Sequence, residues 1–492
     1  MHKLTKKRQG SDTSSGCSSL IELELSPQRN NSDLDESQLT KEESLKLRNQ
    51  HYASVTSLFF RHDPLMIVKG KKQYMYDENG NQYLDCINNV AHVGHCHPAV
   101  TAAATQQISQ LYTNCRYLND NLSTYAHRIT ELFPQPLNVC FLTNSGSEAN
   151  DLALQLARAH SGGTEVITLD AAYHGHTRSC MEISPYKWVD KVKDKPSYVH
   201  VASSPDVYGG KHADAENPAH EYAMDVKHII NNIKQDGKQL SSFIMESMQS
   251  CGGQILPPSG YMLEAFRHVH EAGGLCIADE VQVGFGRVGT HYWAFETQGA
   301  LPDIVTIGKP MGNGHPISGV ITSQKVAESF RKISDHYFNT FAGNPVSCAI
   351  GHAVLDVISD EKLLKHAEIV GNYALQGMQK LKEKHQLIGD VRGIGLFLGM
   401  ELVKDRTKKT PATDEAYEIL HRMKERFIII SVDGPNNNVL KFKPPMCFSK
   451  DNTDQLLQAL DDVITNVSAS DDSSSNKKSM EVPKVKRAVL VQ

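Results

Sequence analysis

The sequence lacks an excess of positive charge and has no long apolar run. Its 51 lysines and arginines are outnumbered by 56 aspartates and glutamates, which gives a net charge of -5. No basic surplus is left to neutralise the phosphates of DNA or RNA or to hold an anionic membrane. No apolar run approaches the roughly 18 residues of a membrane span. We therefore expect neither nucleic acid nor a membrane as a partner.

Cysteines are few and scattered. The ten cysteines are spread over 492 residues, and several lie inside apolar runs. In such runs cysteine behaves as a small hydrophobic residue, which favours free thiols in a reducing compartment over a disulfide framework. With 40% hydrophobic and 22% charged residues, the chain is long enough to bury a large core.

Both ends of the chain are rich in serine, asparagine and charge and lack a sustained apolar period. We interpret residues 1–45 and 468–492 as disordered tails. The basic start of the first tail, from Lys3 to Arg8, also resembles a mitochondrial leader. A mitochondrial and a cytosolic location therefore both stay open.

The middle of the chain predicts an α/β fold. From Val139 onward seven short β-branched runs alternate with helix-length connections: VCFLT, VITLD, YVHV, FIMES, LCIAD, IVTIG and GVIT. This pattern predicts a large domain, residues 101–345, with a mainly parallel seven-stranded sheet between helices. Residues 46–100 and 346–467 mix helical and strand patterns and predict a smaller α+β domain.

Two charged residues follow neighbouring apolar runs of this sheet. Asp279 ends LCIAD and Lys309 follows IVTIG, so both lie where ligands bind in open α/β sheets. A partly desolvated carboxylate needs a cationic or proton-donating partner, and a protonated pyridine nitrogen is one. A lysine in a dry pocket has a lowered pKa and attacks carbonyls. The pair matches what pyridoxal phosphate requires, a Schiff-base lysine and an acid on the ring nitrogen.

The cofactor's phosphate also needs a site. A strand pattern, a turn at Ser145, Gly146 and Ser147, and a helix pattern follow one another in VCFLTNSGSEANDLALQLARAH. Backbone N–H groups at such a helix start, with the Ser147 hydroxyl, form an anion site. Taken alone, the same segment is equally consistent with a purely structural helix cap.

Two other patterns are weaker. GFGRVG, residues 284–289, matches a dinucleotide-binding fingerprint, but DEVQV separates it from the strand and no helix pattern follows. The histidine pairs in GHCHP and YHGHT lack carboxylate or cysteine partners at zinc-like spacing. We expect no dinucleotide and no metal, and interpret these histidines as structural or pocket residues.

The chain resembles the class III aminotransferases, pyridoxal-phosphate enzymes of fold type I, in six motifs that occur in the family's order: NSGSEAND, YHGHT, ADEVQVGFGRVG, TIGKPMGNGHP, FAGNP and VRGIGL. The likeness covers roughly residues 46–467. It implies that Lys309 carries the cofactor and that Asp279 binds the pyridine nitrogen. It also implies a homodimer with shared active sites, or a homotetramer, and related proteins are commonly mitochondrial. The further cofactor contacts it implies are Gln282, Tyr173, Ser145, Gly146, Ser147, Glu246 and, from the neighbouring subunit, Thr340.

Within this family the chain is most similar to the phospho-lyases that act on ethanolamine phosphate or phosphohydroxylysine, which older names describe as alanine–glyoxylate aminotransferase 2-like. Typical transaminases of the class read Glu-Pro-x-Gln-Gly where this chain has ESMQS, residues 246–250. Cys251 stands where dual-specificity members often have a glutamate that pairs with the carboxylate-binding arginine. That arginine is present as Arg392.

The resemblance implies elimination of phosphate from a small phosphorylated amine or amino acid, with ethanolamine phosphate giving acetaldehyde, ammonia and phosphate. Asn88, Asn89, His92 and Arg116 are our candidates for binding the substrate's phosphate, although Asn88 and Asn89 equally suit a turn and Arg116 a surface. The alternatives are phosphohydroxylysine as substrate, amino transfer from alanine or an ω-amine to glyoxylate or pyruvate, and a catalytically silent cofactor-binding protein.

Overall fold

The computed structural model describes residues 39–190 and 193–474, and the chain divides into two compact units at residue 64. The first unit contains helix α1 (Lys41–His51), which begins inside the segment that we interpreted as a tail. A capping box explains this start, because the Thr40 hydroxyl accepts from the amide of Glu43 and the Glu43 carboxylate accepts from the amide of Thr40. Residues 1–38, with the leader-like segment, lie outside the described residues. None of the described helices is long and apolar enough to cross a membrane.

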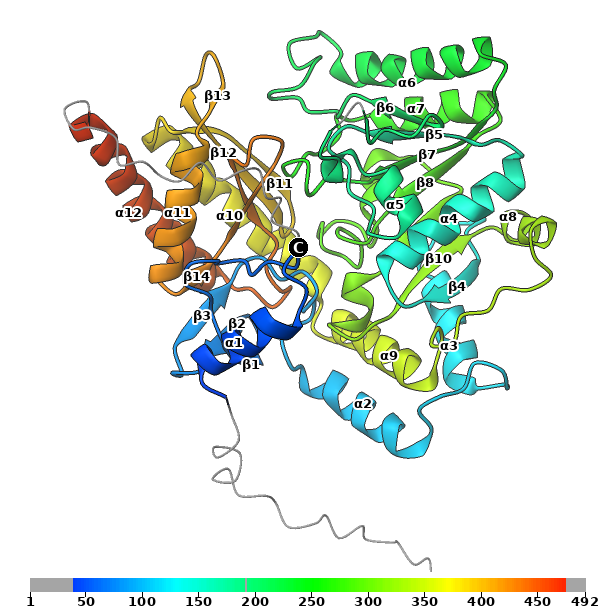
Figure 1. The fold of residues 1–492 in the computed structure, drawn as a ribbon, viewed down its shortest axis with the longest axis horizontal. Coiled ribbons are helices and arrows are strands. Elements are labelled where there is room, and N and C mark those ends of the chain that lie inside the picture. The colour runs from blue at the N-terminus through cyan, green and yellow to red at the C-terminus, as the bar shows by residue number, and fades with distance from the viewer. Residues whose placement is uncertain (1–38, 191–192, 475–492) are drawn as a thin grey trace, which may run out of the picture. The chain divides into compact units, whose positions relative to one another are not determined.

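The second unit is built around a seven-stranded sheet, as the sequence predicts (Figure 1). All seven predicted runs are strands, and only β10 is antiparallel to its neighbours. In spatial order the strands are β4 (Val139–Thr143), β10 (Ser318–Thr322), β9 (Ile304–Ile307), β8 (Leu275–Asp279), β7 (Leu240–Glu246), β5 (Glu165–Leu169) and β6 (Val199–Ala202).

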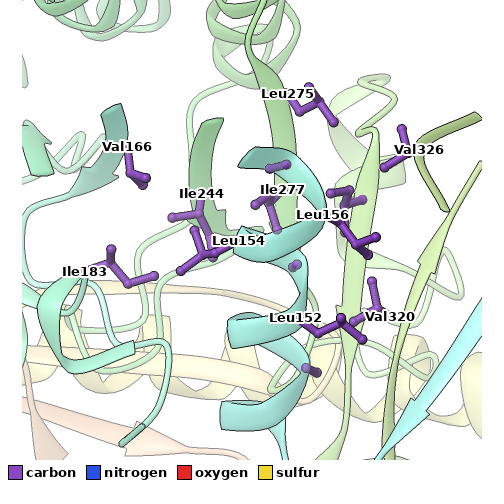
Figure 2. Close-up of a cluster of buried hydrophobic side chains, with 14 of the residues drawn as sticks. Leu152, Leu154, Leu156, Val166, Ile183, Ile244, Leu275, Ile277, Val320 and Val326 are labelled. Atoms are coloured by element: carbon purple, nitrogen blue, oxygen red, sulfur yellow. The ribbon is translucent and has the colours of Figure 1, made fainter. Parts of the chain in front are cut away.

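Helix α4 (Gly146–Ser161) covers one face of this sheet. Its N-cap is Ser145, whose hydroxyl accepts from the amide of Glu148, and its C-cap is Gly162. Figure 2 shows its leucines among strand side chains, and Ile244 of β7 belongs to the same buried cluster. The preceding residue of the strand, Phe243, packs on Phe266 of α7 (Tyr261–Glu271). Because successive strand residues point to opposite faces, both faces of the sheet are covered.

The remaining helical segments lie between strands along the chain, and the last of the α-helices packs in the smaller domain rather than on this sheet. The α-helices are α2 (Pro98–Gln110), α3 (Asp120–Thr130), α5 (Arg178–Glu182), α6 (Pro218–Gln235), α8 (Gln324–Glu328), α9 (Pro345–Asp360) and α10 (Leu363–Lys384). The short 3-10 turns are η2 (Pro185–Lys187), η3 (Ala294–Gln298), η4 (Lys309–Gly312) and η5 (Ser329–Lys332).

The smaller domain combines segments from before and after the large sheet. One of its sheets has the order β1 (Ile67–Lys71), β2 (Tyr74–Asp77), β3 (Gln82–Asp85) and β14 (Ile428–Ile429). The parallel pairing of β14 with β3 joins these distant segments, as expected for an α+β domain made from both. The other sheet contains β11 (Ile388–Ile394), β12 (Phe397–Asp405), β16 (Val439–Phe442) and β15 (Ser431–Asp433), with β13 (Thr410–Pro411) on β12.

Two further helices, α11 (Thr413–Glu425) and α12 (Lys450–Ser474), belong to this domain, and α10 packs against β11 and α12 within it. The helix α12 continues past residue 467, where we expected the second tail to begin. Its leucines and valines repeat at helical spacing up to Val467, which is buried. Residues 475–492 lie outside the described residues.

Candidate functional site

The carboxyl ends of β4, β7, β8 and β9 converge on one edge of the large sheet, because these strands run in the same direction. A cavity of about 320 Å³ lies there. Eight residues that we predicted to contact the cofactor line it: Ser145, Gly146, Ser147, Tyr173, Glu246, Asp279, Gln282 and Lys309. The ninth residue predicted to contact the cofactor, Thr340, is exposed in the single chain and does not line the cavity.

Asp279 is held by three donors at the end of β8. One carboxylate oxygen, Oδ2, lies 2.8 Å from Asn150 Nδ2 and 2.8 Å from His174 Nδ1, and the other accepts from the amide of Val281 at 3.0 Å. The Thr306 hydroxyl donates to Asn150 Oδ1 at 2.7 Å, which fixes the amide so that its N–H groups face Asp279. The carboxylate therefore has a set orientation in a buried site.

His174 and Asn150 were not among our predicted site residues. His174 Nε2 is buried and has no hydrogen-bond partner within the described residues. The sequence carried one signal for Asn150, since it lies four residues after Gly146 and so one helical turn along α4.

Glu246 ends the neighbouring strand β7 and lies beside Asp279. Its carboxylate accepts from the amides of Tyr173 at 3.1 Å and Ser250 at 3.0 Å. Burial, with the nearby Asp279 charge, raises the pKa of Glu246 to about 6. The two amides hold this carboxylate against the cavity wall.

Lys309 begins the turn η4 directly after β9 and lines the cavity. Burial lowers the pKa of its ammonium group, while Cys251 and Asp279 act in the opposite direction. A lysine whose free amine is more accessible near neutral pH is a better nucleophile toward a carbonyl.

The start of α4, where the sequence predicts an anion site, lies at the cavity. Its first residues, Gly146 and Ser147, line the cavity, and helix N-termini favour negative charge. A Cβ at Gly146 would lie 2.8 Å from Val281, so only glycine lets the helix approach β8 this closely. At Gly175 φ is +128° and a Cβ would lie 2.4 Å from the Ser147 hydroxyl, which accepts from the amide of His176.

Gln282, predicted to contact the cofactor's ring hydroxyl, is oriented by a lysine that we did not predict. Its side-chain oxygen, Oε1, accepts from Lys443, whose ammonium also lies 2.8 Å from the Ser250 hydroxyl. Burial strongly lowers the pKa of Lys443. On its other side, the Gln282 amide lies 4.0 Å from the Cys251 thiol.

Tyr173, predicted to stack on the cofactor ring, lies next to Tyr186, with ring centroids 6.1 Å apart. The ammonium of Lys187 lies 5.1 Å from the Tyr173 ring centroid and 5.4 Å from that of Tyr186. The Tyr186 hydroxyl donates to Asp433, which also pairs with Lys441. This aromatic wall is therefore backed by charged side chains.

None of the five predicted substrate residues belongs to the cavity lining. Asn88 accepts from the amides of Val90 and Ala91, as a turn former does. Asn89 is buried and donates to the Gln282 carbonyl oxygen at 3.3 Å. Arg116 is exposed and stacks on Phe338, 5.3 Å from the ring centroid.

His92 is fully buried, and both of its ring nitrogens have partners. Nε2 lies 2.8 Å from the Phe285 carbonyl oxygen, and Arg287 donates to Nδ1 at 3.3 Å. Burial, reinforced by Arg287, lowers the pKa of His92 to about 3. Our assignment of His92 to a substrate phosphate is therefore corrected, because its neutral ring serves to hold Arg287 and the backbone.

Arg392 is occupied by protein acceptors. Its guanidinium donates to the carboxylates of Asp390 and Glu401, both at 2.8 Å, and to the carbonyl oxygen of Gly253 at 2.6 Å. Arg392 does not belong to the cavity lining. Two carboxylates thus neutralise the arginine that we expected to bind a substrate carboxylate.

The cavity fits pyridoxal phosphate by its donor set. It combines a lysine with a lowered pKa, a carboxylate fixed by three donors, a tyrosine ring and a helix N-terminus that glycine leaves open. These match the Schiff-base amine, the pyridine-nitrogen acid, the ring contact and the phosphate site that the cofactor needs.

Comparison with known proteins agrees with this site. The family described as "Aminotransferase class-III" matches residues 60–464. The chain is similar to "Alanine--glyoxylate aminotransferase 2-like" from Drosophila melanogaster, 53% identical over 87% of this chain and 88% of that protein. It is also similar to "Ethanolamine-phosphate phospho-lyase homolog 1" from Caenorhabditis elegans, 42% identical over 87% of this chain and 94% of that protein.

A solved structure, a phospholyase from Arthrobacter in complex with phosphoethanolamine, aligns with a TM-score of 0.81 and 38% identity over 86% of this chain and 99% of its own. The fold of the described residues, the cavity and these matches agree. The chain belongs to the class III aminotransferase family and is an enzyme that uses pyridoxal phosphate.

Proposed function

We propose that this enzyme is a phospho-lyase that converts ethanolamine phosphate to acetaldehyde, ammonia and phosphate. The relatives named for ethanolamine phosphate and phosphoethanolamine support this choice of substrate. In the proposed reaction no amino acceptor takes part. The named alternative, amino transfer from alanine to glyoxylate, requires one.

In this proposal the cavity residues have distinct tasks. Asp279 binds the pyridine nitrogen, the start of α4 at Gly146 and Ser147 holds the cofactor phosphate, and Tyr173 contacts the ring. Ser145 shapes this start as its N-cap, Glu246 orients the loop at Tyr173, and Gln282 contacts the ring hydroxyl. When bound, pyridoxal phosphate supplies an electron sink for the carbon next to the amine nitrogen.

Lys309 is the acid–base residue of the proposal. Its free amine removes the proton from the carbon that bears nitrogen. The C–H electron pair then forms the carbon–carbon double bond as the neighbouring C–O bond breaks and phosphate leaves. Water hydrolyses the resulting enamine to acetaldehyde and ammonia, so that all atoms are accounted for.

The observation that carries the proposal is the pairing of Arg392 with Asp390 and Glu401. Binding a substrate carboxylate there would require the Arg392 guanidinium to give up one of two close, half-buried ion pairs. Alanine, glyoxylate and phosphohydroxylysine all carry a carboxylate, whereas ethanolamine phosphate does not. The occupied arginine therefore favours ethanolamine phosphate.

The proposal includes a homodimer with shared active sites, in which Thr340 reaches the partner's cofactor. Large apolar side chains near it are exposed in the single chain, among them Phe341 at 67% and Leu118 at 92%. Arg116 contacts Phe338, so the segment that carries Leu118 lies beside the segment that carries Phe341. Exposed apolar side chains gathered in this way fit a partner surface.

Two assays on the cofactor-loaded enzyme distinguish the alternatives. We expect phosphate release from ethanolamine phosphate and no glycine formation from alanine and glyoxylate. Lys309→Ala should abolish phosphate release, while the exposed Lys193→Ala should leave it unchanged. Glycine formation without phosphate release would replace this proposal with the aminotransferase.

A further inference from the structure

One cation beside the cavity has no hydrogen-bond acceptor. The ammonium of Lys187 is buried and has no hydrogen-bond partner among the described residues. Its near neighbours are the faces of the Tyr173 and Tyr186 rings. Because a buried ammonium without an acceptor is costly, such a group in a native protein calls for an explanation, often a bound ligand.

The other lysines close to this wall are already satisfied. Lys441 pairs with Asp433, and Lys443 donates to Ser250 and Gln282. Asp433, a carboxylate that attracts Lys187, is shared between Tyr186 and Lys441. The Asp433 carboxylate is therefore engaged by other groups and makes no hydrogen bond to Lys187.

Cys251 does not supply the missing negative charge. It is buried near Lys187, and burial raises the pKa of its thiol to about 12, so the thiol is neutral. Glu246 faces the amides of Tyr173 and Ser250 instead. The described residues thus leave the Lys187 ammonium without an acceptor, and a bound anion would supply one.

We infer that Lys187 binds the phosphate group of the substrate beside Tyr173. This inference rests on the proposed function and adds to it a residue that selects for a phosphorylated amine. Tyr173 lines the cavity, and the Lys187 ammonium lies 5.1 Å from its ring centroid. The flexible four-carbon stem of lysine lets the ammonium move from between the two rings to an anion in the cavity. Among our earlier candidates, His92 has both ring nitrogens occupied by the protein, and Arg116 is exposed and stacks on Phe338.

The first test uses inorganic phosphate as a probe of the cofactor-loaded enzyme in calorimetry. The cofactor occupies the α4 phosphate site, so saturable binding reports a second site. We expect Lys187→Met to weaken this binding roughly 10- to 100-fold, the loss of one charge-assisted contact. Lys187→Arg should retain most of the binding, and the exposed control Lys193→Met should match the wild type.

Kinetics with ethanolamine phosphate completes the test. Lys187→Met should raise KM by a similar factor while kcat and the cofactor absorbance change little. Unchanged phosphate affinity and unchanged KM in Lys187→Met would overturn the inference while the lyase stands. If the wild type releases no phosphate but Lys187→Met still loses phosphate binding, the proposed function fails and the anion site stands.

Discussion

At the scale of single residues, Asp279 and the three groups that donate to it form the best-defined part of the site. Asp279→Asn removes the charge that we propose binds the pyridine nitrogen, and we expect kcat/KM to fall by about 10²- to 10³-fold, as for other lost electrostatic contacts. Asn150→Ala only loosens the carboxylate and should cost roughly 10-fold. Steady-state kinetics with ethanolamine phosphate measures both.

The control is Asp236→Asn, the same change at an exposed residue after α6. It should leave kcat/KM within error of the wild type. Equal activity of Asp279→Asn and wild type would contradict the assigned role of Asp279.

His92 gives a prediction on the pH dependence of stability. Its pKa is about 3 in the folded chain against an ordinary 6.5, so the unfolded state binds the extra proton at acidic pH. Folding is therefore destabilised as pH falls below 6.5, by about 2 kcal/mol between pH 6.5 and 5 from this residue.

Urea unfolding of wild type and His92→Gln at several pH values measures this contribution. The glutamine can still hydrogen-bond but does not titrate. We expect the stability advantage of the wild type over the variant to shrink as pH falls from 6.5 to 5. A difference that is constant over this range would show that His92 is not the titrating group.

The sequence predicted the cavity residues better than the substrate residues. Lys309 and Asp279 could be placed because strand ends meet at one edge of a parallel sheet. Lys443 was missed since it alternates with apolar residues in VLKFKPP, a pattern typical of a strand with one solvated face, whereas the structure buries it. The ion pairing of Arg392 could not be predicted from the sequence either, because its partner Glu401 lies on the adjacent strand, β12.

At the level of elements, we expect cofactor binding to depend on the start of α4. Gly146→Ala places a methyl group 2.8 Å from Val281 and moves the helix start away from β8. We expect cofactor affinity, measured by equilibrium dialysis, to fall at least about 10-fold, as when groups that position a ligand are displaced. A second variant, Gly162→Ala, changes the glycine at the other end of α4, where φ is +75° and an added Cβ would meet no atom within 4 Å.

This second variant is the control for helix stability. It should lower the unfolding free energy by about 1 kcal/mol because alanine disfavours positive φ, and it should leave cofactor affinity unchanged. Equal cofactor affinity of the two variants would contradict an anion site at the start of α4.

All seven strands of the large sheet were predictable, because each is a short apolar run between helix-length connections. Element ends near the termini were less predictable. The helix α1 has only two apolar residues, Leu45 and Leu47, and none of its residues is buried, so no apolar period predicts it. Only the capping pair Thr40 and Glu43 marks its start. Likewise α12 continues into serine-rich sequence that resembles a tail.

At the scale of the whole molecule, the proposed dimer is open to test. Phe341→Asp puts a charge on an apolar side chain that is 67% exposed in the single chain. We expect light scattering to show twice the chain mass for the wild type and a shift toward one chain mass for the variant, with loss of activity because the active site is shared. Leu263→Asp, an exposed leucine on α7, is the control and should stay dimeric.

We propose that the enzyme eliminates phosphate and needs no amino acceptor. The most direct measurement follows phosphate, ammonia and acetaldehyde from ethanolamine phosphate over many turnovers of the cofactor-loaded enzyme, with no keto acid present. We predict equal amounts of the three products, each far above the enzyme concentration, and none with Lys309→Ala. A reaction that stops after one turnover per subunit, or that proceeds only when glyoxylate is added, would contradict the claim and identify an aminotransferase.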